Sequence, residues 1–279
     1  MGHLSKLSLA LAGIICLFAA CNKQHTSAES GNIQSAEYKA FHAAHSDKTC
    51  SSSVWAEYPV SGEKQYLDSV RMWIDTVLSY NPFSEEGKMP AFKGNRTDAQ
   101  ALVTYYSQQK MKEASANKDE DMFFEDGMLL ENHDSIFVSF KNTYLTSLSI
   151  MNYCFLGGAH GSTTVYSQTF DNKTGKTYGW NMIKDKNKLL QYITDGLKDY
   201  FEVATVQQLK EQLILDSPSI PLPAQAPYFS GDGLILQYQQ YEIAPYAAGL
   251  PDILIPWDKC KDVLTQEIID MLQSEITKQ

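Results

Sequence analysis

The sequence predicts an α+β protein in which helices pack on a hairpin-rich, mixed or antiparallel sheet, divided into two sequential subdomains. A strand-like run at residues 53–60 precedes amphipathic helical patterns at 64–80 and 98–117, and strand-like runs joined by short turns follow between residues 128 and 178. Helices and strands then mix again from residue 187 onward. Because the strands are linked mainly by hairpins, a doubly wound parallel sheet is excluded.

The N-terminus has the pattern of a lipoprotein signal peptide. Lys6 precedes fourteen apolar or small residues, a run too short to span a bilayer but typical of a secretory signal. The run ends in Phe18-Ala19-Ala20-Cys21, which resembles the bacterial lipobox. We therefore expect residues 1–20 to be a signal peptide and Cys21 to carry the lipid that anchors the chain. The residue after Cys21 is Asn22, whereas an Asp at that position resembles a signal for retention in the inner membrane. The sequence therefore favours the periplasmic face of the outer membrane of a Gram-negative bacterium, and exposure at the cell surface is left open.

Residues 21–48 are predicted to form a flexible tether, because they are polar and lack apolar periodicity. His25, His42 and His45 are then expected to be solvated tether residues. A secretory signal also places the chain in an oxidising compartment, where three cysteines remain after Cys16 and Cys21. Cys154 lies in an apolar run and is predicted to be a buried small hydrophobe. Whether a disulfide forms is left open, with three possible pairs; if one forms, we favour Cys50, just before the first strand, with Cys260, just inside the last helix.

The N-terminal subdomain is predicted over residues 49–165. It begins with a strand at residues 53–60 whose inner face carries Val54, Ala56 and Tyr58. The helix at 64–80 and a second helix at 98–117, capped by Thr97, follow. The remaining elements are a hairpin with strands at 128–131 and 135–140, an exposed turn at 132–134 that contains His133, and a strand at 147–155.

The C-terminal subdomain is predicted over residues 166–279. Its expected strands are 162–171, 176–178, 228–229, 234–241 and 253–255, the first of which crosses the subdomain boundary. Its expected helices are 187–201, capped by Asn187, then 206–215 and a closing helix at 257–276. Proline- and glycine-rich loops are expected at 217–227 and 243–251.

Two loops carry the residues that we select as candidate ligand contacts. The segment Gly157-Gly158-Ala159-His160-Gly161 combines free backbone dihedrals with one histidine. The second loop follows a Tyr-rich strand and supplies Tyr241, Pro245 and Tyr246. Both loops follow strands, so we predict that they lie at the same end of the sheet and form one recognition surface. The alternative is structural, with His160 bonded to a backbone carbonyl and Tyr246 filling the core.

Composition narrows the class of ligand. The chain has 23 Lys and Arg against 33 Asp and Glu, a net charge of −10, and no basic cluster, which argues against nucleic-acid binding. No CxxC or paired-histidine spacing predicts a metal, and no cofactor is expected. Adjacent acids such as Glu85-Glu86 are read as solvated loop residues rather than as a glycosidase pair.

Three motifs together resemble the RsiV-type extracytoplasmic domain. They are Tyr153 to Gly161 (YCFLGGAHG), Phe170 to Lys176 (FDNKTGK) and Tyr241 to Gly249 (YEIAPYAAG), and the resemblance covers nearly all of the chain beyond residue 50. That family includes a lysozyme-sensing anti-sigma factor ectodomain and the N-terminal region of a peptidoglycan deacetylase. The sigma-binding segment and the deacetylase domain have no counterpart in this sequence, so the resemblance implies an envelope binding unit only.

Three functions remain open. The first is a lipid-anchored, non-catalytic binding module for a basic, lysozyme-like protein or for peptidoglycan glycan. The second is a hydrolase of an envelope polymer that uses His160 as its base. The third is a structural outer-membrane lipoprotein without a small ligand. The sequence leaves the oligomeric state open.

Overall fold

The protein is described from a computed structural model over residues 33–82, 87–116, 130–215 and 219–277. Its strands form two sheets, one of six strands in the order β1-β2-β3-β4-β5-β6 and one of three in the order β7-β8-β9. β2 and β3 run parallel, and all other neighbours are antiparallel. The predicted α+β class with a mixed sheet and two structural regions is therefore confirmed.

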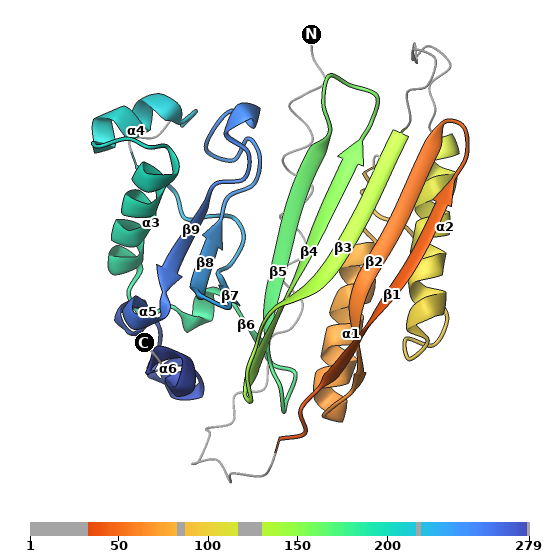
Figure 1. The fold of residues 1–279 in the computed structure, drawn as a ribbon, viewed down its shortest axis with the longest axis horizontal. Coiled ribbons are helices and arrows are strands. Elements are labelled where there is room, and N and C mark those ends of the chain that lie inside the picture. The colour runs from red at the N-terminus through yellow and green to blue at the C-terminus, as the bar shows by residue number, and fades with distance from the viewer. Residues whose placement is uncertain (1–32, 83–86, 117–129, 216–218, 278–279) are drawn as a thin grey trace.

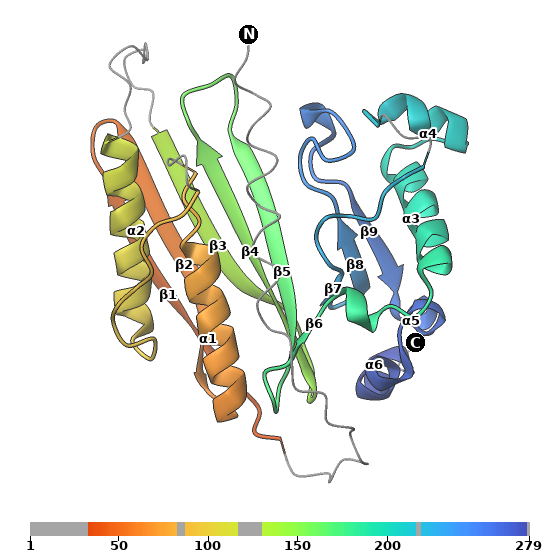
Figure 2. The ribbon, with the colours of Figure 1, turned by 180° about the vertical axis from the view of Figure 1, so that it is seen from behind.

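The first region is the six-stranded sheet with two helices on one face (Figures 1 and 2). In the described part of the chain no helix covers the upper part of the other face (Figure 1), and we call it the open face. The elements of this region are β1 (Glu37–Ser46), β2 (Cys50–Ser61), α1 (Lys64–Leu78), α2 (Ala99–Ala116), β3 (Leu130–Lys141), β4 (Leu145–Phe155), β5 (Ser162–Asp171) and β6 (Thr177–Tyr178).

The helix face of the sheet holds one apolar core. In α1, Tyr66, Val70, Ile74 and Leu78 recur every four residues, so they form a single stripe that is fully buried. The stripe packs on alternate residues of β2, which are Val54, Ala56 and Tyr58 as predicted. Arg96 Nε and the Tyr106 hydroxyl both donate to the buried Asp75 carboxylate, at 2.7 and 2.5 Å, and so fix the start of α2 against α1.

The second region lies beside β5 and has its own core, centred on Leu234, Leu236 and Ile193. Its elements are the 3-10 helix η2 (Trp180–Met182), α3 (Lys186–Tyr200), α4 (Val206–Gln212), β7 (Tyr228–Ser230), β8 (Gly233–Gln237), the 3-10 helix η3 (Tyr246–Ala248), β9 (Asp252–Pro256), α5 (Trp257–Val263), α6 (Gln266–Met271) and α7 (Gln273–Ile276). β7 joins the regions, because Phe229 N and O bond Ser147 Oγ and Ser139 Oγ at 3.3 and 3.0 Å.

The predicted tether is wrong for residues 37–46, which form β1. Ala43 faces the core, and His45 Nδ1 lies 2.8 Å from Ser107 Oγ on α2. The segment looked polar because only one face of β1 is covered, so the residues between the inward positions stay exposed. His42 and His45 are therefore strand residues, whereas His25 and Cys21 lie outside the described residues.

The predicted hairpin turn at residues 132–134 is also wrong, because β3 is one continuous strand. Asn132 and Asp134 are buried on the helix face, and the Asp134 carboxylate accepts from Lys110 Nζ at 2.5 Å. This ion pair makes a charged residue acceptable inside the sheet, and it has no signal in local sequence periodicity.

Several element ends differ from the prediction because other residues cap them. Asp98, not Thr97, accepts from the backbone at the start of α2, and Asp185, not Asn187, does so for α3. α4 ends at Gln212 and β8 ends at Gln237. The closing helix is three short helices, because Leu264 pairs with Ile183 and Thr265 N donates to Met182 O at 2.8 Å.

No helix in the described ranges is long and apolar enough to cross a bilayer. The predicted subdomain boundary at residue 165 falls inside β5, whereas β5 and β6 belong to the six-stranded sheet. The subdomain limits themselves stay a prediction.

Candidate functional site

The Gly157–Gly161 segment connects β4 to β5 and is shaped by its glycines. Gly157 has φ 81°, a conformation that favours glycine. Gly161 is buried, and a Cβ atom there would lie 2.4 Å from the Tyr153 ring. Tyr153 therefore packs directly on the backbone of the loop, and only glycine at position 161 permits that approach.

The second loop runs from the end of β8 to the start of β9. Tyr238 N donates to Pro251 O at 2.8 Å, which closes its base. Glu242 accepts from Gln239 N and from Ala224 N, both at 2.7 Å. Tyr241 has φ 64°, an uncommon conformation for a residue with a side chain, and the residue is 57% exposed. The fold thus holds a tyrosine outward at some cost in backbone strain.

The two loops meet through His160, Tyr241 and Tyr246. The His160 and Tyr246 rings stack with centroids 3.6 Å apart and an angle of 18° between their planes. The Tyr246 hydroxyl donates to Gly161 O at 2.8 Å, and Tyr241 lies 5.9 Å from the Tyr246 ring. We call His160, Gly161, Tyr241 and Tyr246 the two-loop cluster. The predicted shared end of the sheet is confirmed, while a role in binding stays a prediction.

Hydrogen bonds define the roles of the His160 nitrogens. Nδ1 lies 3.0 Å from Gly161 O, and a carbonyl can only accept, so Nδ1 carries the proton in this arrangement. Nε2 is then free to accept from the Tyr241 hydroxyl, which lies 3.4 Å away. Part of the structural alternative also holds: His160 does bond a backbone carbonyl. Tyr246, however, is only half-buried and lies outside the core.

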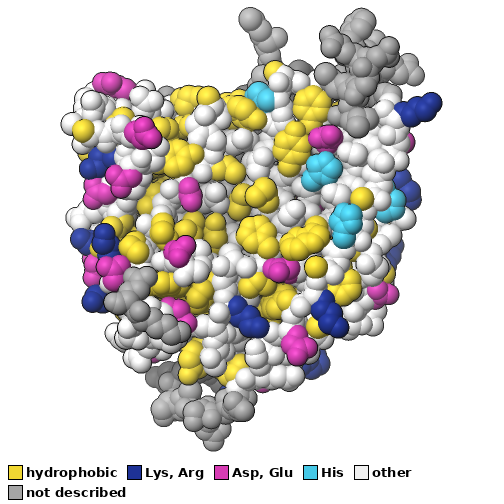
Figure 3. Space-filling view, in the orientation of Figure 1, with side chains coloured by type: hydrophobic (Ala, Val, Ile, Leu, Met, Phe, Trp, Pro, Cys, Tyr) yellow, Lys and Arg dark blue, Asp and Glu magenta, His cyan; other side chains and the backbone are white. Residues whose placement is uncertain are grey.

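The open face continues the two-loop cluster across three strands. Tyr153 stacks on His133, with ring centroids 6.2 Å apart and planes 7° from parallel. His133 Nδ1 lies 2.8 Å from Ser53 Oγ, so His133 is fixed on the sheet rather than in a turn. Trp55 and Met151 on the same face are 36% and 42% exposed. Figure 3 shows histidine side chains among hydrophobic ones in the upper right part of this face.

The opposite, helix face carries a buried polar group that sequence reasoning missed. Lys110 and Asp134 are 0% and 1% exposed, and Asn152 Nδ2 donates to the second Asp134 oxygen at 2.8 Å. The side chains of Asn132 and Ser52 are buried beside them, without a hydrogen-bond partner in the described part of the chain. In a strand, Asn132 and Asp134 lie on the same face, so the run Asn132-His133-Asp134 would have indicated the buried polar group only if it had been predicted as a strand.

The cysteines do not form the predicted disulfide. Cys50, Cys154 and Cys260 are free and buried, and Cys50 and Cys260 belong to different apolar clusters. The prediction that Cys154 is a small buried hydrophobe is confirmed. Burial raises the pKa of Cys154 to about 11 and that of Cys260 to about 12, so neither thiol is a ready nucleophile.

The other selected residues have simpler surroundings. Gly158 is exposed, with open space where a Cβ would point. Pro245 is exposed and begins the turn of η3, where its carbonyl accepts from Ala248 N at 2.9 Å. Within the described ranges, no three His, Cys, Asp or Glu side chains are grouped so that they could hold a metal ion.

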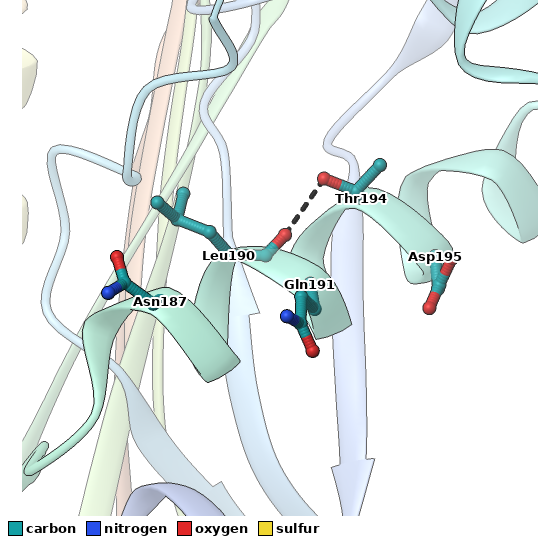
Figure 4. A pocket seen from close by; sticks show the side chains of 5 residues that line it. All are labelled: Asn187, Leu190, Gln191, Thr194 and Asp195. Carbon is teal, nitrogen blue, oxygen red and sulfur yellow. Dashed lines mark hydrogen bonds between the residues drawn. The ribbon is translucent and has the colours of Figure 1, made fainter.

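A hollow of about 400 Å³ lies on α3 (Figure 4) and is lined by residues of neither loop. Its lining residues are Asn187, Leu190, Gln191, Thr194 and Asp195. All five come from one helix, and the bond between them that Figure 4 marks joins Thr194 Oγ1 to Leu190 O, a bond within the helix itself. Side chains from a single helix surface do not converge on a ligand, so this hollow is not our candidate site.

Comparison with known proteins finds a family similarity in the second region. Residues 181–258 match a family model described as "Protein of unknown function (DUF3298)". A DUF3298 family member from Bacteroides fragilis NCTC 9343 has a similar crystal structure, with a TM-score of 0.67, 18% identity, and coverage of 89% of this chain and 100% of that chain. A DUF3298 family protein from Pseudomonas aeruginosa PAO1 has a TM-score of 0.55, 14% identity, and coverage of 84% and 96%. No curated protein matches the chain. Residues 181–258 are thus similar to the DUF3298 family, and the chain shares its overall fold with these two structures.

Proposed function

We propose that this chain is a non-catalytic binding module of the bacterial cell envelope and that the two-loop cluster is its recognition surface. The observation that carries the proposal is the stack of His160 on Tyr246 beside the exposed Tyr241, built from loops about 80 residues apart in sequence. Flat aromatic rings on a rigid scaffold supply large contact area with little loss of side-chain entropy on binding.

The contacts of His160 favour binding over hydrolysis. The histidine base of a hydrolase is commonly paired with a carboxylate, which orients the ring and stabilises its protonated form. In the described part of the chain, the polar contacts of His160 are a backbone carbonyl and the Tyr241 hydroxyl, and no carboxylate is among them. The hydrolase alternative predicts that His160→Ala abolishes release of products from muropeptides, whereas the binding module releases none in either form.

A basic, lysozyme-like protein is the ligand that we favour. Residues 130–279 hold both loops and carry 17 Asp and Glu against 11 Lys and Arg, so their field attracts a cationic partner. The resemblance to the RsiV-type domain points to the same ligand class. Peptidoglycan glycan is the second candidate, because the exposed Tyr241 ring beside Tyr246 also offers a flat surface to a sugar ring.

The experiment is calorimetric titration of lysozyme and, separately, of muropeptides into the wild type and into two tyrosine variants. Tyr241→Ala removes an exposed ring of the two-loop cluster. Tyr144→Ala is the matched control, because Tyr144 is 45% exposed but lies in the β3–β4 connection at the other end of the sheet. We expect Tyr241→Ala to weaken binding at least about tenfold and Tyr144→Ala to leave it unchanged. Failure of both ligands to bind the wild type at tens of micromolar would refute the proposal.

Membrane attachment through Cys21 is a separate part of the proposal, and it rests on the lipobox-like segment alone. Metabolic labelling with a palmitate analogue tests it directly. The wild type should incorporate the label and fractionate with the outer membrane. The Cys21→Ala variant should not be labelled. Label that persists in Cys21→Ala would show that the anchor lies elsewhere.

A further inference from the structure

The outer edge of β5 is closed by three glutamine side chains of the second region: Gln225, Gln239 and Gln240. Thr163 N donates to Gln240 Oε1 at 2.9 Å, and Val165 uses both its N and its O, at 3.1 and 2.8 Å, on the Gln239 amide. Gln225, with its side-chain amide oriented so that its oxygen faces the sheet donor, accepts from Ser167 N at 2.7 Å. These side chains occupy the backbone positions that a further strand would use.

The outer edge of β1 is different. Asp47 N donates to Cys50 O at 2.9 Å and closes the β1–β2 hairpin, so the odd-numbered residues of β1 bond β2. The backbone N–H and C=O groups of the even-numbered residues therefore point outward: Tyr38, Ala40, His42 and Ala44. In the described part of the chain only His42 O has a partner among these groups, Gln100 Nε2 at 3.0 Å.

Charge near this edge is low. Residues 33–116 carry 9 Lys and Arg against 10 Asp and Glu, whereas residues 130–279 carry most of the negative charge of the chain. On α2, Gln100 reaches the β1 edge, so Thr104 and Gln108, one and two turns further on, flank the same edge without charge. Edge strands are normally protected by charges, prolines or bulges in their middle, and the middle of β1 reads Ala-Phe-His-Ala-Ala.

We propose that β1 pairs antiparallel with β1 of a second copy of this chain and so joins two sheets into one. The occupant must be an extended backbone, because only that matches a row of alternating donors and acceptors. A second copy fits better than another acidic protein. The two nearly neutral regions meet, while the acidic second regions lie beyond β5, on the far side of each sheet (Figure 1).

Side chains select one register, with Phe41 at the two-fold axis. The backbone of Ala40 then forms hydrogen bonds with that of the second copy's His42, and the backbone of Tyr38 with that of the second copy's Ala44. The outward N–H and C=O groups therefore pair with one another. Phe41 lies opposite the second copy's Phe41, and Glu37 lies opposite its His45; both kinds of pair are favourable across strands. The α2 helix lies over β1 and β2, so its axis is about half a strand spacing inward from β1 in each copy. With the two β1 strands about 4.8 Å apart, the two α2 helices would then lie about 10 Å apart, which is the distance between packed helices.

The test is site-specific cross-linking of the full chain under mild oxidation in cells. Phe41→Cys places two thiols opposite each other at the axis, within reach of a disulfide. Ala40→Cys is the matched control, because Ala40 is exposed on the same strand but faces a histidine instead of its own copy. We expect a covalent dimer linked through residue 41, identified by mass spectrometry, from the first variant only.

Sedimentation of the purified full chain over about 1 µM to 1 mM supplies the second measurement. Ala40→Pro removes an outward N–H in each copy and no bond within the chain, so it should weaken the dimer at least about tenfold while circular dichroism stays unchanged. If Ala40→Pro does not fold, Ala44→Pro makes the same test, because it also removes an outward N–H. A monomer at every concentration, equal cross-linking from positions 40 and 41, or a dimer insensitive to proline would each overturn the proposal.

Discussion

His133 and Asp134 are consecutive residues of β3 with opposite surroundings. Asp134 lies on the helix face, 1% exposed, between Lys110 and Asn152. His133 lies on the open face with 40% of its side chain exposed, against Ser53 and the ring of Tyr153. Its nearest carboxylate is that of Glu131, 3.9 Å away.

The difference comes from the alternation of side chains along a strand. Residues of one polar run are divided between a covered face, where every charge needs a partner, and an uncovered face, where polar groups remain available to a ligand. Stability should therefore depend on Asp134, and recognition on the side of the sheet that His133 shares with the two-loop cluster.

The largest expected effect is that of Asp134→Ala. It leaves the Lys110 ammonium buried without its counter-ion and should lower the free energy of unfolding by about 3–5 kcal/mol. His133→Ala is the control and should change it by about 1 kcal/mol at most, because it loses the bond to Ser53 but leaves no buried charge without a partner. Urea unfolding measures both. Similar losses for the two variants would contradict the division between the faces.

The double variant Lys110→Met with Asp134→Leu refines this prediction. It removes both charges together and should recover most of the stability that Asp134→Ala loses, because the desolvation cost disappears with the pair. Recovery would identify the uncompensated charge, rather than the lost volume, as the cause.

Alkaline pH should weaken the helix face next. Burial raises the pKa of Cys154 from 9.0 to about 11, which the Asp134 charge assists and the Lys110 charge opposes. Below pH 9 the thiol is protonated in both states and its contribution is fully present. As pH rises from 9 to about 11 the unfolded chain loses this proton first, so up to roughly 3 kcal/mol is lost. The slope of unfolding free energy against pH between 9 and 10 should be shallower in Cys154→Ala; an unchanged slope would exclude this thiol as the cause.

A smaller effect is expected from Gly161→Ala on the open-face side. The new Cβ would lie 2.4 Å from the Tyr153 ring, so the ring or the loop must shift at a cost of about 1–3 kcal/mol. Gly158→Ala meets open space and serves as the control. Binding of the ligand should weaken in the first variant and not in the second. Equal binding by both would mean that the position of Tyr153 does not matter for recognition.

The smallest effect separates the two tyrosines of the two-loop cluster. Tyr246→Phe loses the 2.8 Å bond to Gly161 O and should cost about 1 kcal/mol. Tyr241→Phe loses only a 3.4 Å contact on an exposed ring and should cost a few tenths at most. Thermal unfolding of the two variants in parallel shows which one loses more stability. A larger loss for Tyr241→Phe would mean that Tyr241, rather than Tyr246, holds the loop.

Elements with regular apolar spacing could be predicted from sequence. The stripe Val70-Ile74-Leu78 and the alternation Val54-Ala56-Tyr58 depend only on local periodicity, and both are found buried. β1 and the middle of β3 escaped prediction because their inward positions include Ala43 and Asp134, which look polar or neutral in isolation. Their burial depends on α2, a partner that lies far away along the chain.

The candidate site could be predicted in outline only. Loops that follow strands at one end of a sheet are expected to be neighbours, and this brought Gly157–Gly161 and Pro245–Gly249 together. The details of the site are the stacking of His160 on Tyr246, the unusual backbone at Tyr241 and the glutamine bonds along β5. None of these has a local sequence signal.

The parallel pairing of β2 with β3 also has a consequence for the order of folding. Ser53 and His133 are partners although 80 residues separate them, whereas β1–β2 and β3–β4–β5 are joined by short connections. Local hairpins close quickly, and distant pairings must first overcome the entropy of a long intervening chain. We therefore expect two pre-formed halves to meet at the β2–β3 seam, with α1 and α2 docking as the seam closes, and we expect that encounter to set the folding rate.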